Sequence, residues 1–423
     1  MQQEGGNMLT FLSHYREMTI RYILFVFVIH CFSTSVAAME GMILDESTDK
    51  PIASAIITAN GKMYRTDREG HYQIPHTDII GIRAAGYERI FTHFKRKIYL
   101  KKFHPKALYL SSYGAANKKI MGNAKHLIRT TQINALVIDV KTDRGEIAYD
   151  SSSPVAKEIG AQKRVSFPQL KDFIGELKEE GVYTIARVVC FKDTTFVRAF
   201  PQLGAKYPNG TLYRDREGSY WIDPSHKQAW EYLLTIAEES AKAGFDEIQF
   251  DYVRFPDKRG LSFSVKNRQS ERVRIITEFL EYARFRLIPY NVFISIDIFG
   301  YVCWNDADLG IGQRVDAMAP YVDYISPMLY PSSFQVGIPG YPNPVKANYQ
   351  IVKHSLDKAL EKSSGSPLAY RPWLQAFKDY AFDRRNYGKK EISEQIRASE
   401  DFGSNGWMLW NAGNRYSAEG IEK

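Results

Sequence analysis

The chain from about residue 106 onward alternates short apolar runs with longer amphipathic stretches. The apolar runs predict eight strands, at 107–112, 135–141, 182–190, 247–251, 292–297, 322–330, 370–377 and 407–411. Apolar side chains recur at helical spacing between them, as in the stretch before the fourth strand at Trp230, Leu233 and Ala237. Eight β/α units predict an α/β fold, a (β/α)8 TIM barrel over 106–423. A doubly wound parallel sheet is the alternative, although no glycine-rich phosphate loop follows the first strand.

Residues 39–105 show a different pattern, of short alternating strands separated by turns. This pattern predicts a small antiparallel β-sandwich domain ahead of the barrel. The segment resembles the carboxypeptidase regulatory-like domains, which have a transthyretin-like sandwich. The resemblance is carried by Asp45, Pro51, Thr66-Asp67-x-x-Gly70-x-Tyr72 and Ala85-Gly86-Tyr87. It implies an accessory module without a catalytic role.

Polar residues stand at the carboxyl ends of the predicted barrel strands, where barrel enzymes place their chemistry. Because side chains alternate along a strand, an inward polar residue fixes which of its neighbours also face inward. This parity predicts inward positions for Val137, Asp139 and Lys141 on the second strand. It predicts a mouth lined by Asp139, Arg187, Asp251, Asp297, Tyr330, Gln375 and Trp410. Glu247 lies at the opposite end of its strand and is predicted to be structural.

Carboxylates, one cation and aromatic rings around one mouth indicate cleavage of glycosidic bonds. Two carboxyl groups flank the bond in such enzymes, one as general acid and the other as nucleophile or base. Adjacent barrel strands can deliver either the retaining or the inverting separation, so both outcomes stay open. Arg187 would hold a neighbouring carboxylate ionised, while a more buried carboxyl group keeps its proton.

The carboxylates also have structural interpretations. Asp251 could form an ion pair with Arg254, three residues later in the chain. Asp297 could cap the segment that follows its strand. Asp223, followed by Pro224, is predicted to be the N-cap of a helix with proline at its first position.

The remaining candidates have structural interpretations as well. Lys141 or Arg144 could neutralise Asp139 behind the site. Trp373 and Trp410 could simply pack in the core, as aromatic residues more often do.

Histidine placement narrows the chemistry. The barrel region holds only His126, His226 and His354, and none falls at the end of a predicted strand. Metal-dependent hydrolases and Ser-His-Asp hydrolases would need a histidine there. We therefore predict carboxylate chemistry with no metal and no cofactor. Aspartate-rich loops would permit a Ca²⁺ ion, but no EF-hand pattern is present.

The first 38 residues have the pattern of a secretory signal peptide. Arg16 and Arg21 precede an apolar run at 22–32, and small residues follow, with cleavage predicted near Ala37 or Ala38. We therefore expect an exported protein, in the periplasm, cell envelope or medium, without a stable membrane span. An uncleaved N-terminal anchor is the alternative. In an exported chain Cys190 and Cys303 could pair or stay free.

The net charge of +8 is modest for 423 residues, and no basic block interleaved with aromatic residues is present, so nucleic-acid binding is not expected. The barrel region from about 108 to 411 is similar to the "putative glycoside hydrolase domain" family, a (β/α)8 group related to the α-amylase superfamily. The segments that carry this resemblance are Ile248-Gln-Phe-Asp-Tyr-Val-Arg-Phe-Pro256, Val137-Ile-Asp-Val-Lys141, Ala186-Arg187, Trp221-Ile-Asp-Pro224, Ser295-Ile-Asp-Ile-Phe-Gly300, Ser326-Pro-Met-Leu-Tyr-Pro331 and Trp373-Leu-Gln375.

In amylase-like barrels the nucleophile ends the fourth strand and the acid lies on a later strand. The resemblance therefore implies Asp251 as nucleophile and Asp297 as general acid, although amylases have glutamate at the latter position. The expected substrate-binding residues are Asp139, Arg187, Tyr252, Arg254, Tyr330, Trp373, Gln375 and Trp410. The resulting hypothesis is an exported glycoside hydrolase acting on a polysaccharide. The alternative is a carbohydrate-binding or envelope scaffold protein on a degenerate barrel.

Overall fold

The structure, a computed structural model, describes residues 38–363 and 365–422. The predicted signal segment lies outside the described residues apart from Ala38. Eight parallel strands form a closed barrel in the order β10-β11-β12-β13-β14-β15-β8-β9. The strands are β8 (Lys106–Leu110), β9 (Ala135–Lys141), β10 (Tyr183–Val189), β11 (Glu247–Asp251), β12 (Phe293–Phe299), β13 (Tyr324–Met328), β14 (Trp373–Gln375) and β15 (Trp407–Trp410). The predicted barrel is therefore confirmed, and the doubly wound alternative is wrong because the sheet closes.

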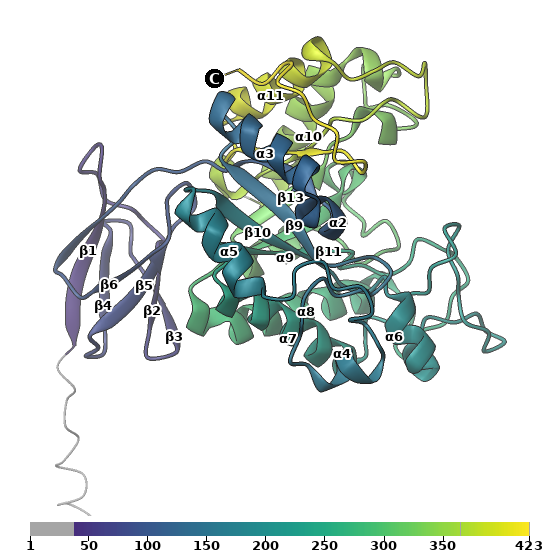
Figure 1. The fold of residues 1–423 in the computed structure, drawn as a ribbon, viewed down its shortest axis with the longest axis horizontal. Coiled ribbons are helices and arrows are strands. Elements are labelled where there is room, and N and C mark those ends of the chain that lie inside the picture. The colour runs from purple at the N-terminus through teal and green to yellow at the C-terminus, as the bar shows by residue number, and fades with distance from the viewer. Residues whose placement is uncertain (1–37, 364, 423) are drawn as a thin grey trace, which may run out of the picture.

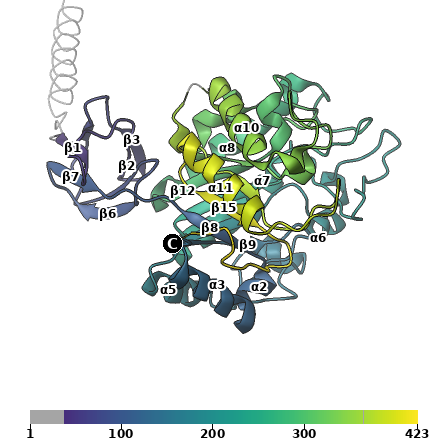
Figure 2. The same ribbon diagram turned by 90° about the horizontal axis from the view of Figure 1, so that it is seen from above.

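Helices surround the barrel and cover the outer faces of its strands (Figures 1 and 2). They are α2 (Ser112–Ala116), α3 (Lys118–Thr130), α4 (Pro154–Glu158), α5 (Leu170–Glu179), α6 (Thr194–Ala199), α7 (Lys227–Ala243), α8 (Gln269–Leu287), α9 (Val315–Met318), α10 (Asn348–Ser363) and α11 (Lys389–Phe402). Among the described residues no helix is both long and apolar enough to cross a membrane. Helix α7 begins at Lys227 with His226 as its N-cap, so the prediction that Asp223 caps this helix is wrong. Asp223 instead accepts hydrogen bonds from Ser225 and from the backbone of Ser264, which joins two loops.

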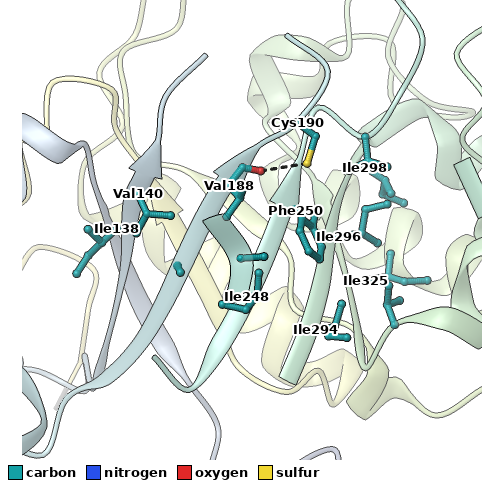
Figure 3. Close-up of a cluster of buried hydrophobic side chains, with 14 of the residues drawn as sticks. Ile138, Val140, Val188, Cys190, Ile248, Phe250, Ile294, Ile296, Ile298 and Ile325 are labelled. Atoms are coloured by element: carbon teal, nitrogen blue, oxygen red, sulfur yellow. Dashed lines mark hydrogen bonds between the residues drawn. The ribbon is translucent and has the colours of Figure 1, made fainter. Parts of the chain in front are cut away.

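Two apolar layers hold the barrel together. The outward side chains of the strands, among them Ile138, Val188, Ile248 and Ile296, pack against the helices and are fully buried (Figure 3). The inward layer holds Val137, Ile185, Phe293 and other buried side chains. Such strands, buried on both faces, read as continuous apolar runs in the sequence. Cys190 belongs to the outer layer, and both it and Cys303 are buried free thiols.

Ahead of the barrel, two small sheets form a sandwich. One sheet has the order β4-β1-β7 and the other β3-β2-β5-β6. The strands are β1 (Met39–Asp45), β2 (Ile56–Ala59), β3 (Lys62–Arg65), β4 (His71–Ile74), β5 (Ile79–Arg83), β6 (Ile90–His93) and β7 (Lys97–Leu100). All pairings are antiparallel except that of β1 with β7, which is parallel. Apart from that pair, the expected antiparallel sandwich is present.

The sandwich packs against the amino ends of the barrel strands. Arg83 contacts Asp323, the residue before β13, and Asn291, two residues before β12. Arg89 likewise bonds to Asp246, the residue before β11. A Cβ on Gly81 would lie 2.7 Å from the Asn291 side chain, so the two units approach closely here. The carboxyl ends of the strands are thus left free for a site.

Candidate active site

Arg187 on β10 is the hub of a polar cluster at the carboxyl ends of the barrel strands. Its Nη1 donates to Asp139 Oδ1 at 2.6 Å, while Nε and Nη2 donate to Asp251 Oδ2 at 3.0 and 2.5 Å. All three side chains are buried. Burial alone would lower the pKa of Arg187, but Asp139 and Asp251 together raise it well above its ordinary value. One permanent cation therefore joins carboxylates from the two strands beside it.

Asp139 belongs to this cluster and is also held by a residue that the sequence did not single out. The Tyr109 hydroxyl, from β8, donates to Asp139 Oδ2 at 2.6 Å. Burial raises the pKa of Asp139, although Arg187 and Tyr109 oppose that shift. Tyr109 also stacks on Trp410 with ring centroids 3.9 Å apart. Tyr109 lies within the predicted first strand, and alternation from the inward Ala107 is the one sequence feature that could have placed it at the site.

Lys141 does not neutralise Asp139, and it does not line the mouth. Its Nζ binds Asp193 at 2.8 Å and lies over the Tyr232 ring of helix α7, so it faces the outer layer. The parity prediction for Lys141 is wrong because the β9–β10 pairing shifts register between Arg187 and Val188. Such a bulge reverses the side to which the following residues point.

Asp251 ends strand β11 beside a strained residue. The backbone N–H of Tyr252 donates to Asp251 Oδ1 at 2.6 Å, and Tyr252 has φ of 54°. A bulky residue in this left-handed region costs energy and is found preferentially at functional sites. Arg254 does not pair with Asp251. It stacks on Trp221 and Tyr252 at 4.6 and 5.4 Å, so the interpretation of Asp251 as the ion-pair partner of Arg254 is wrong.

Asp297 on β12 is a nearly inaccessible carboxyl group with one hydrogen-bond donor, the indole of Trp373, whose Nε1 lies 2.8 Å from Oδ1. Burial raises the pKa of Asp297 well above its ordinary value, and the negative charge of Asp251 adds to the effect. The next helical turn (Gly300–Trp304) has no side-chain cap, so Asp297 is not the cap that the sequence allowed. Asp297 thus has the environment of a carboxyl group that keeps its proton.

These side chains open on a cavity of about 440 Å³. Eight residues predicted from the sequence line it: Arg187, Asp251, Tyr252, Arg254, Asp297, Tyr330, Trp373 and Trp410. Four further lining residues were not predicted: Glu217, Phe377 and Tyr380 on loops, and Phe299 at the end of β12. Strand periodicity carries no information about loops, which is why Glu217 and Tyr380 were missed. Phe299 lies beyond the predicted end of its strand at 297, and Phe377 ends the predicted strand 370–377 but was not singled out.

Asp139 and Gln375 were both expected to bind substrate, but neither is among the residues that line the cavity. Gln375 lies away from it. It is fully buried, and its side chain bonds to Ser332 and to the carbonyl of Phe377. With its amide groups engaged, Gln375 braces the loop after β13 instead of facing a ligand. Glu247, as predicted, lies at the far end of β11 and pairs with Arg371.

Several solved structures resemble this chain. A hypothetical protein from Ruminiclostridium thermocellum is 37% identical over 45% of this chain and 96% of its own, with a TM-score of 0.41. The PgaB (BpsB) glycoside hydrolase domain from Bordetella bronchiseptica is 12% identical and covers 74% of this chain and 95% of its own, with a TM-score of 0.53. The second likeness supports the fold alone. The Bacillus cereus spore cortex-lytic enzyme SleL is 12% identical over 77% of this chain and 75% of its own, with a TM-score of 0.43.

None of the curated proteins matches the chain in sequence. Residues 107–416, which span every strand of the barrel but the first residue of β8, match the family described as "Putative glycosyl hydrolase domain". This match extends over most of the chain and includes the whole carboxylate cluster. The chain therefore belongs to this family of glycosyl hydrolase domains.

Proposed function

We propose that this protein is an exported glycoside hydrolase that cleaves glycosidic bonds in a polysaccharide. Asp251 acts as nucleophile or base and Asp297 as general acid. The observation that carries this proposal is the unlike environment of two carboxyl groups in one cavity. Asp297 has its pKa raised by burial and by the charge of Asp251, whereas Asp251 accepts three hydrogen bonds, two of them from a guanidinium group. Glycosidases need such a division between a protonated and an ionised carboxyl group.

The other residues of the cavity support these roles. Arg187 and the Tyr252 N–H fix the carboxylate of Asp251 in one orientation, so little reorganisation is needed as bonds change. Trp373 fixes the carboxyl group of Asp297 in the same way. The partly buried rings of Tyr330 and Trp410 offer apolar faces on which sugar rings can pack, whereas Trp373 is buried behind them.

The decisive experiment is a hydrolysis screen of polysaccharides and aryl glycosides with product analysis. We expect Asp251→Asn to abolish turnover of every substrate that the wild type cleaves. Asp297→Asn should lower the rate of hydrolysis of a natural glycoside by about 10²–10⁴-fold. It should lower the rate much less for an aryl glycoside, whose leaving group needs no proton. The anomeric form of the first product would distinguish retention from inversion.

Asp172→Asn is the matched control, because this exposed aspartate on α5 lies outside the cavity and its loss removes the same charge. Full activity in both cavity variants would overturn the proposal. Glycan binding by the wild type without any turnover would instead favour the carbohydrate-binding scaffold.

Export rests on the N-terminal pattern of basic residues, an apolar run and small residues. We expect the mature protein, recovered from its native host, to begin close to Ala38 or Met39. N-terminal sequencing checks this directly. A mature chain that retains the apolar run at 22–32 would indicate an anchor and would contradict release of the protein.

A further inference from the structure

A second cavity, of about 470 Å³, adjoins the catalytic one. The two share Glu217, Tyr252 and Arg254 as lining residues. The other residues that line the second cavity are Lys192, Tyr207, Tyr213, Arg214, Asp215, Arg216, Trp221, Asp257 and Lys258. Because Tyr252 directly follows Asp251, the second cavity begins one residue from the proposed nucleophile. A polymer bound across Asp251 would extend into it.

The wall of this second cavity is an ordered structure. Residues 204–222, between α6 and α7, are tied by short bridges to each other and to Lys192 and Ser262. Ala205, Tyr213, Trp221 and Leu261 form a small buried apolar core inside it. Figures 1 and 2 show the loops of this region beyond α6, on the side of the barrel away from the sandwich. A wall with its own core can hold charged side chains in fixed positions.

One of the cations of this cavity, Lys192, lies among three carboxylates, which more than neutralise its charge. The Lys192 ammonium group is nearly inaccessible and binds Glu217, Asp143 at 3.5 Å and Asp215 at 3.4 Å. Asp215 also accepts a hydrogen bond from the indole of Trp221. Two of the three carboxylates of the cavity are therefore committed to Lys192.

Four other cations have no such partner. Within the described residues, no carboxylate oxygen lies within 4.0 Å of the charged nitrogens of Arg214, Arg216, Arg254 or Lys258. Among the described residues that line the cavity, Asp257 is the one carboxylate not bound to Lys192. The lining holds five cations and three carboxylates, and Asp143 also binds Lys192, so this side of the cleft has a small excess of positive charge.

Arg254 is the best positioned of the four cations, because it lines both cavities. Its guanidinium plane is fixed against the Trp221 and Tyr252 rings. Among residues 38–363 and 365–422 its one hydrogen-bond acceptor is the carbonyl of Phe255, to which Nη1 donates at 3.2 Å. A guanidinium group has five N–H donors, so most of those on Arg254 remain available. A planar fork of this kind matches a carboxylate or a phosphate.

The other side of the catalytic cavity is different in character. It presents the rings of Phe299, Tyr330, Phe377 and Tyr380, and those of Phe299 and Tyr380 are 38% and 48% exposed. Phe377 and Tyr380 lie nearly parallel, with centroids 6.2 Å apart. The cleft therefore has one aromatic side without charge and one cationic side, with Asp251 between them.

From this asymmetry we propose that the substrate is an anionic polysaccharide, and that the cavity around Arg254 binds an acidic sugar beside the bond to be cleaved. This inference rests on the proposed function and specifies its substrate class. Arg254 binds the anionic group as a fork, and Arg216 and Lys258 add electrostatic attraction. The ligand chemistry is a carboxylate or a phosphate attached to a sugar chain.

The test measures binding by titration calorimetry to the full chain carrying Asp251→Asn, so that turnover does not interfere. The probes are oligomers of glucuronic and of galacturonic acid, the same oligomers after reduction of their carboxyl groups, and a glycerol phosphate polymer. We expect at least one acidic probe to bind about tenfold or more tightly than its neutral counterpart, a difference of about 1.4 kcal/mol. This preference should shrink as ionic strength rises from about 0.05 M to about 0.5 M.

Added to that background, Arg254→Gln should remove most of the preference, and Arg254→Lys should restore part of it. Arg216→Gln should weaken acidic probes about threefold and leave neutral probes unchanged. The matched control is Arg129→Gln, because Arg129 is an exposed arginine on α3 outside the cleft. This variant should change neither the affinity for acidic probes nor that for neutral probes. A preference for the phosphate polymer alone would assign the site to phosphate.

Equal affinity for acidic and neutral probes would overturn this inference, as would no binding of any acidic probe. Equal effects of Arg216→Gln and Arg129→Gln on the affinity for acidic probes would also overturn it. These outcomes are separate from failure of the proposed function. Hydrolysis that depends on Asp251 can persist without any preference for acidic sugars. Binding of acidic sugars can likewise persist in a protein that cleaves nothing.

Discussion

The two ends of strand β11 carry the same kind of ion pair in opposite settings. At its amino end, Glu247 binds Arg371 at 2.6 Å, both side chains are fully inaccessible, and Tyr183 donates a further hydrogen bond at 3.0 Å. At its carboxyl end, Asp251 binds Arg187 at 2.5 Å beside a cavity. The two carboxylates have the same kind of residue and the same kind of partner. They differ in whether a ligand can reach them.

The cover over each end accounts for this difference. The sandwich packs on the residues just before β11, β12 and β13, and Arg371 stacks on Tyr324 at 4.1 Å, so no ligand reaches Glu247. The carboxyl ends carry long loops, whose residues wall the cavity above Asp251. In barrels of this kind, chemistry at the upper face and stability at the lower face are the general rule.

The largest expected effect comes from Asp251→Asn. If Asp251 is the nucleophile or base, kcat should fall by about 10³-fold or more, because the amide can neither attack nor accept a proton. The melting temperature should fall less than in a variant that leaves a buried arginine unpaired, because Arg187 keeps Asp139 as a charged partner. Steady-state kinetics and thermal unfolding on the same preparation check both. A large loss of stability with unchanged kcat would place Asp251 in the same class as Glu247.

Glu247→Gln is the converse experiment. It leaves Arg371 buried without a charged partner, so the free energy of unfolding should fall by about 3–5 kcal/mol. The kcat of the protein that remains folded should stay close to that of the wild type. Urea unfolding and active-site-normalised kinetics measure the two quantities. The double variant Glu247→Leu with Arg371→Leu serves as control and should recover part of the stability, because it removes both buried charges.

The third prediction concerns stability and pH at Asp297. Because its pKa is raised in the folded protein above the ordinary 3.8, the folded state holds the proton longer than the unfolded chain does. Stability should therefore fall as pH rises from near 3.8 to the folded pKa. Asp297→Asn should be more stable than the wild type at about pH 8 and nearly equal to it at about pH 4. Melting curves at the two pH values check this, and a variant less stable at about pH 8 would contradict it.

The smallest expected effect is that of Trp373→Phe. Its indole N–H stabilises the charged form of Asp297, so its loss should raise the pKa of that carboxyl group further. If Asp297 is the acid, the alkaline limb of the kcat profile should move upward by about one pH unit. Phe299→Ala, which alters a lining ring without touching either carboxyl group, is the control and should leave that limb in place. A downward shift would exclude Asp297 as the acid.

Much of the fold was predictable because strand periodicity is local. The predicted limits of the second and fourth strands, 135–141 and 247–251, coincide with β9 and β11, and the other six overlap observed strands. The alternation along them correctly brought Arg187, Asp251 and Asp297 to one cavity. It failed at Lys141 on β9, because the pairing of β9 with β10 shifts register after Asp139 and Arg187, and Lys141 then points to the outer layer.

What the sequence determined by itself was the barrel and the candidate pair of carboxyl groups, because apolar runs and the polar residues that end them are properties of consecutive positions. Only the tertiary structure decided their partners. Arg187 could have served any carboxylate at the mouth, and its bonds to Asp139 and Asp251 depend on which strands are neighbours in the closed sheet. The cationic side of the cleft also depends on three-dimensional packing, because it joins segments 192–222 and 252–258 and pairs two of its carboxylates with one buried lysine.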